Sequence, residues 1–195
     1  MNTEQLMNEI LAVLQTIQNN KPKLEKLHQF VLNEIYEEPK PEEIHEKYKN
    51  AVSRIADSLL AGLICYFNPD TFEVEDLPEI MVQDPEEFEL MTGGEPADSL
   101  ELKHKNWTKC IEIEPMESHE SFKVMENFLD EVQDYKLKEK LLNTLNRKKP
   151  FANFKFLVEN SDYRQQWFDF RQKYYEDYVW DMISIDLEED KSHKG

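Results

Sequence analysis

Glycine is scarce in this chain, with four among 195 residues, at positions 62, 93, 94 and 195. Phosphate-cradling loops and nucleophile elbows depend on glycine, because the backbone must approach a ligand closely or turn sharply. The Walker pattern and the dinucleotide-binding fingerprint are both absent. The scarcity also disfavours a turn-dense β protein and favours helices joined by polar or proline-marked segments.

Long apolar runs are also lacking. The longest spans residues 59–67, far short of the roughly 20 residues that cross a bilayer. The first cation is Lys21 and no apolar stretch follows it, so we expect no secretory signal. Cys65 and Cys110 are too few for a disulfide framework. We therefore predict a cytoplasmic protein without membrane association, whose two thiols are reduced and buried; a Cys65–Cys110 disulfide across neighbouring strands is the alternative.

Metal-binding motifs are incomplete. "HEKYK" (45–49) and "HESFK" (119–123) begin like a zinc-binding helix but carry lysine where the second histidine is required. The window 84–95 has the length of a calcium loop, yet Glu89 occupies the glycine position, which predicts an exposed acidic loop instead. With 41 acidic residues, no carboxylate pair stands out as catalytic. We predict no catalytic residue, metal or cofactor, and keep a hydrolase of unknown type as a further alternative.

Negative charge is concentrated in the middle of the chain. Residues 61–117 hold three cations and fifteen anions, which is two-thirds of the net charge of −18. Such a segment repels a phosphate backbone and attracts a basic protein, although a solvated acidic face is its simplest interpretation. The candidate partner face consists of Glu73, Glu75, Asp84, Glu86 and Glu87.

Hydrophobic periodicity predicts an α+β fold. Three amphipathic helices should precede residue 60 as an N-terminal bundle, with breaks near Pro22 and in "EEPKPEE". Runs 63–67 and 72–77 predict a hairpin around Asn68-Pro69, and "WTKCIEIEP" a third strand of a small antiparallel sheet. Helices resume near Ser118 and form an aromatic-rich layer ending near Ile185. The predicted regions are 1–58 (helical), 59–185 (α+β core) and 186–195 (acidic tail).

Aromatic residues gather near the C-terminus, where residues 151–180 hold 11 of the 22. Rings beside cations are typical of single-stranded nucleic-acid binders. The rings at 167, 170, 174 and 178 repeat at helical spacing, however, which favours a core stripe. The cations at 147–149 then complement the end of the preceding helix. The alternative basic patch consists of Arg147, Lys148, Lys149, Lys155, Arg164 and Arg171.

The segment "PFANFKFLVENSDYRQQWFDFR", with Phe151, Phe154, Lys155, Trp167, Phe168, Phe170 and Arg171, resembles the C-terminal signature "aFrrFkd…eWyaFr" of a bacterial family, uncharacterised protein family 0158. The resemblance extends to two further segments and covers roughly residues 60–182. "CIEIEP" with the following helix resembles its "yieip…MedFi" segment. "ICYFNPDTFEVEDLP" resembles its hairpin, with Phe72 where glycine is usual. The resemblance implies an α+β fold and no known activity, cofactor or catalytic residue.

We therefore expect a non-enzymatic interaction module whose acidic face meets a basic protein. The alternative is nucleic-acid binding through the basic patch. Neither the partner's identity nor the oligomeric state follows from the sequence.

Overall fold

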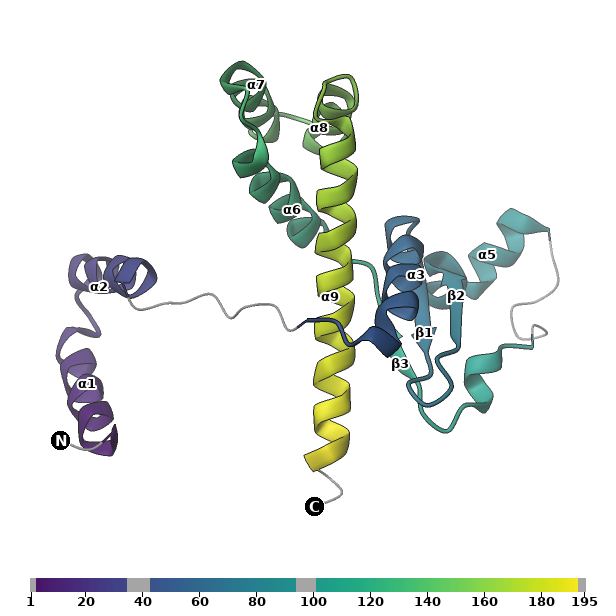
Figure 1. Cartoon of the computed structure of the whole chain (residues 1–195), viewed down its shortest axis with the longest axis horizontal. Helices are drawn as coiled ribbons and strands as arrows, with labels where there is room; N and C mark the ends of the chain where they lie inside the picture. The colour runs from purple at the N-terminus through teal and green to yellow at the C-terminus, as the bar shows by residue number, and fades with distance from the viewer. Residues whose placement is uncertain (1–2, 35–42, 94–100, 193–195) are drawn as a thin grey trace. The chain divides into compact units, whose positions relative to one another are not determined.

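The computed structural model describes residues 3–34, 43–93 and 101–192 (Figure 1). The chain divides into two compact units, Met1–Glu42 and Glu43–Gly195. The first unit contains α1 (Thr3–Ile17) and α2 (Lys21–Glu34), and the predicted break near Pro22 lies between them, with Pro22 in the first turn of α2. Apolar side chains of α1 are half exposed in the described structure, among them Ile10 at 55% and Val13 at 60%.

The second unit combines helices with one small sheet. Its helical elements are η1 (Glu46–Tyr48), α3 (Lys49–Leu60), α4 (Glu79–Gln83), α5 (Pro85–Thr92), η3 (Lys103–Asn106), α6 (Ser118–Glu131), α7 (Tyr135–Leu145), α8 (Pro150–Glu159) and α9 (Arg164–Ser192). Its strands are β1 (Leu63–Phe67), β2 (Val74–Pro78) and β3 (Ile111–Ile113). The α+β class and the three predicted strands are confirmed.

The sheet is antiparallel throughout, with strand order β2-β1-β3. Cys65 lies opposite Asp76 on one side and Ile113 on the other, which fixes the register. Residues 64–67 of β1 are all buried, because both faces of this central strand are covered. Cys65 and Phe67 join the main core, whereas Tyr66 points to the other face, where it meets His104 of η3.

The main core forms where α3 packs between β1 and α9 (Figure 1). On α3 the buried side chains Val52, Ile55 and Leu59 follow the predicted helical spacing. The C-terminal half of α9 supplies Val179 and Ile183, both fully buried. Helix α3 therefore belongs to the second unit. The predicted boundary between the helical region 1–58 and the α+β core 59–185 stays a prediction.

An aromatic cluster joins α6, α8 and α9, as predicted for the C-terminal layer. The Phe128 ring meets Trp167 at 5.0 Å and Phe154 at 6.4 Å between centroids, both edge to face. Phe154 and Phe128 are fully buried, and Trp167 is 4% exposed. The core interpretation of this ring stripe is therefore confirmed for α9.

Four local expectations are wrong. Residues 85–92 of the expected acidic loop form helix α5, capped by Asp84 and closed by Gly93 at a φ of 59°; residues 94 and 95 of that window lie outside the described residues. The run 72–77 alternates in sequence and predicts one buried and one solvent-facing side, but all five residues of strand β2 are half buried. Helix α9 continues to Ser192, past the expected end near Ile185. Cys110 is exposed rather than buried.

Candidate functional site

The five predicted acidic residues do not form one surface. Glu75 is tied into the fold, because its carboxylate accepts hydrogen bonds from the backbone N–H groups of Lys103 at 3.0 Å and His104 at 2.8 Å. Its Oε2 also lies 2.6 Å from His104 Nδ1. Glu73 lies in the hairpin loop before β2, while α4 and then α5 follow the opposite end of that strand (Figure 1). The structure therefore brings together Asp84, Glu86 and Glu87 only.

These three carboxylates surround the start of α5. The Asp84 side chain accepts a hydrogen bond from the Glu87 backbone N–H at 3.0 Å, and Glu86 and Glu87 occupy the first turn. Negative charge is favourable there, because it complements the exposed N–H groups of a helix start. Near the other end of α5, Leu90 is 86% and Met91 71% exposed. We name this surface, residues 84, 86, 87, 90 and 91, the α5 face.

The predicted basic residues fall into two groups. Arg147, Lys148 and Lys149 are exposed in the connection between α7 and α8. Lys155, Arg164 and Arg171 belong to α8 and α9, which pack together. The Arg164 and Arg171 guanidinium groups lie over the Phe168 ring, 4.9 and 5.4 Å from its centroid.

Most rings beside these cations are covered. Trp167, Tyr175 and Trp180 are buried, and Tyr174 is half buried against the core. Phe151 and Phe156 are the exceptions, at 42% and 67% exposure. Nucleic-acid binding of the predicted kind needs a row of accessible rings. Beside these cations the structure offers two exposed rings, Phe151 and Phe156, and the rings of the α9 stripe are covered.

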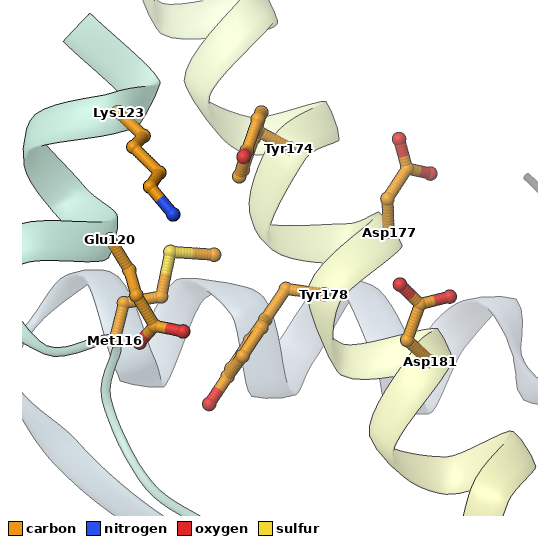
Figure 2. A pocket seen from close by; sticks show the side chains of 7 residues that line it. All are labelled: Met116, Glu120, Lys123, Tyr174, Asp177, Tyr178 and Asp181. Atoms are coloured by element: carbon orange, nitrogen blue, oxygen red, sulfur yellow. The ribbon is translucent and has the colours of Figure 1, made fainter. Parts of the chain in front are cut away.

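A pocket of about 260 Å³ lies between α6 and α9 (Figure 2). Its lining combines apolar and ionisable side chains: Met116, Glu120, Lys123, Tyr174, Asp177, Tyr178 and Asp181. In Figure 2 the Lys123 amine points from α6 into the space between Tyr174 and Met116, whereas Asp177 and Asp181 leave the side of α9 away from Lys123. A neighbouring pocket of about 580 Å³ shares Tyr174 and Asp177.

Two groups of this pocket already have structural hydrogen bonds. The Glu120 carboxylate accepts from the Glu117 backbone N–H at 2.9 Å and so caps α6. The Tyr178 hydroxyl donates to the Glu114 carbonyl at 3.3 Å. Burial raises the pKa of Asp177, and the nearby Asp181 raises it further against the opposing effect of Lys173. A raised carboxyl pKa suits a general acid, but Lys123 lies on the opposite wall, so this arrangement does not assemble a nucleophile with its base.

The cysteines are both free thiols. Burial raises the pKa of Cys65 to about 11, so its thiolate is scarce at neutral pH. Burial and then the charge of Glu112 raise the pKa of the exposed Cys110. Reactive cysteines have a lowered pKa, and neither thiol meets that condition.

Neither a metal-binding cluster nor a membrane-spanning helix is found in residues 3–34, 43–93 and 101–192. No group of three or more His, Cys, Asp or Glu side chains within these ranges is arranged to hold a metal ion. No helix described there has the length and apolar character needed to cross a membrane.

Sequence reasoning missed two features of these surfaces. Leu90 and Met91 follow an acidic stretch and carried no periodic signal of their own. The contact between Glu75 and His104 joins residues 29 positions apart, and neither sits in a motif.

Comparison with curated proteins and with solved structures finds no match. A family model does match, over residues 89–189. The match includes β3, helices α6 to α8 and most of α9, and it begins after the β1–β2 hairpin. Because it spans more than half of the chain, the protein belongs to the Uncharacterised protein family (UPF0158).

Proposed function

We propose that the protein is an interaction module whose α5 face binds a basic amphipathic segment of another protein. The observation that carries the proposal is the exposure of Leu90 and Met91, at 86% and 71%, on a helix whose start bears three carboxylates. Large apolar side chains flanked by charge of one sign are typical of docking surfaces for helices of opposite charge.

The two kinds of side chain contribute differently. The carboxylates at positions 84, 86 and 87 attract a cationic partner and set the approach rate, with an effect that salt weakens. Leu90 and Met91 supply apolar area, which contributes about 25 cal/mol per Å² covered. A partner segment should therefore carry lysine or arginine on one side and leucine-like residues on the other.

A synthetic amphipathic helix of lysine and leucine, followed by fluorescence anisotropy, tests this arrangement. Leu90→Ser should weaken binding about tenfold through lost apolar contact. Glu87→Lys should weaken it by about threefold or more at low salt. The matched control is Glu73→Lys, which changes the net charge equally but lies in the hairpin loop.

Equal loss from Glu87→Lys and Glu73→Lys would mean that total charge alone attracts the peptide. An unchanged affinity for Leu90→Ser would show that the apolar pair makes no contact. Either result refutes the α5 face as a docking site.

The structure lends less support to nucleic-acid binding, because the α9 rings are covered. Phe156 at 67% exposure, beside Lys155, is the feature that favours it. A fluorescent single-stranded oligonucleotide titrated at low salt, with Phe156→Ala as the variant, tests this second hypothesis.

A further inference from the structure

A pocket with donor groups and no carboxylate lies where α6, α8 and α9 meet the end of α3. It has a volume of about 220 Å³. Of its ten lining side chains, five are hydrocarbon or thioether, at positions 60, 124, 125, 151 and 154. A sixth, Tyr175, is an aromatic ring with a hydroxyl group. The other four are Ser121, Lys155, Trp167 and Arg171. In a protein of net charge −18, a pocket whose charged lining is entirely cationic is unusual.

The hydrogen-bonding groups at this pocket are mostly donors. Lysine, arginine and the tryptophan indole offer N–H groups and no acceptor, and serine adds a hydroxyl. Two donors here have no acceptor in the described structure although they are sealed from water: Trp167 Nε1 and Arg171 Nε. Trp167 as a whole is 4% exposed. A pocket ligand cannot reach atoms that water does not reach, so these two nitrogens are not part of the binding surface, and the cationic donors left for it are the Lys155 amine and the terminal guanidinium N–H groups of Arg171.

Arg171 is held in place by rings. Its guanidinium lies 5.8 Å from the Trp167 ring centroid and 5.4 Å from that of Phe168. No salt bridge to Arg171 is found within the described residues. Among the residues that the structure describes, the ion-pair partner of Lys155 is Glu159, at a long 3.8 Å, and the Lys155 side chain is 62% exposed. An arginine fixed by stacking and left without a carboxylate is well prepared to bind an anion.

From this juxtaposition we propose that the pocket binds a small organic carboxylate with an apolar body, held by Arg171 and Lys155. The carboxylate accepts hydrogen bonds from the two cations, while the apolar body lies against the hydrocarbon and aromatic wall. On the order of seven to ten non-hydrogen atoms fit, since a water takes about 30 Å³ of liquid volume. This site shares no residue with the α5 face, so the proposal can be tested independently of the proposed function.

Benzoate and cyclohexanecarboxylate are suitable probes, titrated into the full chain and followed by calorimetry and tryptophan fluorescence. Benzamide has the shape of benzoate without its charge, and inorganic phosphate has the charge without an apolar body. We expect saturable binding of both carboxylates and at least tenfold weaker binding of benzamide and phosphate.

Three variants connect the binding to the pocket. Arg171→Gln and Lys155→Met should each weaken benzoate binding about tenfold. Ser121→Leu keeps every charge and fills part of the pocket, so it should weaken binding as well. Lys148→Met removes an exposed cation that does not line the pocket, and it should bind as the wild type does. Thermal melting of each variant shows that it is folded; Lys155→Met carries the test should Arg171→Gln unfold.

The proposal is overturned if neither carboxylate saturates, or if benzamide binds as tightly as benzoate. If phosphate and benzoate bind equally well, the two cations bind any anion, and the proposed contact between an apolar ligand body and the pocket wall is refuted. Binding that falls equally in Lys148→Met and Lys155→Met would place the ligand on the outer surface instead.

Discussion

The imidazole of His104 lies parallel to the phenol ring of Tyr66, with centroids 3.8 Å apart and 6° between the planes. This stack attaches η3 to the face of the sheet opposite the main core. Glu75, on the neighbouring strand, completes the attachment through its hydrogen bonds to the backbone of Lys103 and His104. A carboxylate predicted from sequence to face a partner thus holds together two parts of its own fold.

Replacing Glu75 by glutamine should make the stability of the second unit less dependent on pH. Burial acts to raise the pKa of Glu75, but the hydrogen bonds from His104 and Lys103 outweigh it, and the pKa lies below its ordinary value of 4.5. A lowered folded-state pKa means stability that is present above pH 4.5 and is lost as the pH falls through the folded value. We expect Glu75→Gln to cost about 1–2 kcal/mol at pH 7 and the difference to shrink below pH 4.

Urea unfolding followed by tryptophan fluorescence measures this, since all three tryptophans belong to the second unit. Glu73→Gln, in the exposed hairpin loop, is the control and should change the free energy of unfolding by less than about 0.5 kcal/mol. A constant difference between wild type and Glu75→Gln from pH 7 to pH 3 would contradict the argument.

Two phenylalanines on α8 separate core packing from surface exposure. Phe154 is fully buried and meets Trp167 at 5.2 Å, so Phe154→Ala should destabilise the second unit by about 3–5 kcal/mol. Phe156, two residues further along, is 67% exposed, and its replacement by alanine should cost less than about 1 kcal/mol. Similar urea midpoints for the two variants would argue against the packing of α8 on α9.

Local periodicity predicts those elements whose own sequence has one dry face. The stripe 52, 55 and 59 of α3, the alternation of β3 and the ring spacing of α9 are all of this kind. The burial of strand β2 cannot be predicted from local periodicity, because η3 covers its outer face. The contact that attaches η3 joins Glu75 to His104, 29 positions apart in the sequence. Helix α5 is not predicted from sequence, because a glycine such as Gly93 after a run of acidic residues indicates a loop as readily as the end of a short helix.

The candidate sites were harder to predict than the fold, for the same reason. Acidic residues that are close along the chain predict one common face. In the structure, however, Glu73 and α5 lie beyond opposite ends of β2. Lys155 and Arg171 were predicted as cations of an outer patch, and the structure places both at one pocket. Which cations share a pocket depends on how α6, α8 and α9 pack, and no local pattern encodes that.

The two thiols should differ in reactivity. Cys65 is fully buried with a pKa of about 11, so iodoacetamide at pH 8 should not modify it in the folded protein. The exposed Cys110 should react, though more slowly than a free thiol because its pKa is raised. Glu112→Gln removes one cause of that rise and should speed the reaction. Mass spectrometry of tryptic peptides distinguishes the sites, and equal labelling of both cysteines in the native protein would contradict this prediction.

Phe72 adopts the left-handed backbone conformation, with a φ of 62°, in the loop between β1 and β2. Its backbone N–H donates to the Asn68 carbonyl at 2.8 Å, which closes the loop. Glycine adopts this conformation without strain, whereas a side chain costs about 1 kcal/mol or more. The Phe72 ring offsets the cost by packing on Tyr48, 5.2 Å away between centroids.

Backbone strain and ring packing can be separated by comparing two substitutions at position 72. Alanine removes the ring and keeps the strain, whereas glycine removes both. Phe72→Gly should therefore be more stable than Phe72→Ala by about 1 kcal/mol, even though glycine has the more flexible unfolded chain. At Glu73, where the backbone is not left-handed, the order should reverse or vanish. If the alanine variant is more stable than the glycine variant at both positions, left-handed backbone strain at residue 72 is negligible. Loss of ring packing would then account for all of the stability change caused by replacing Phe72.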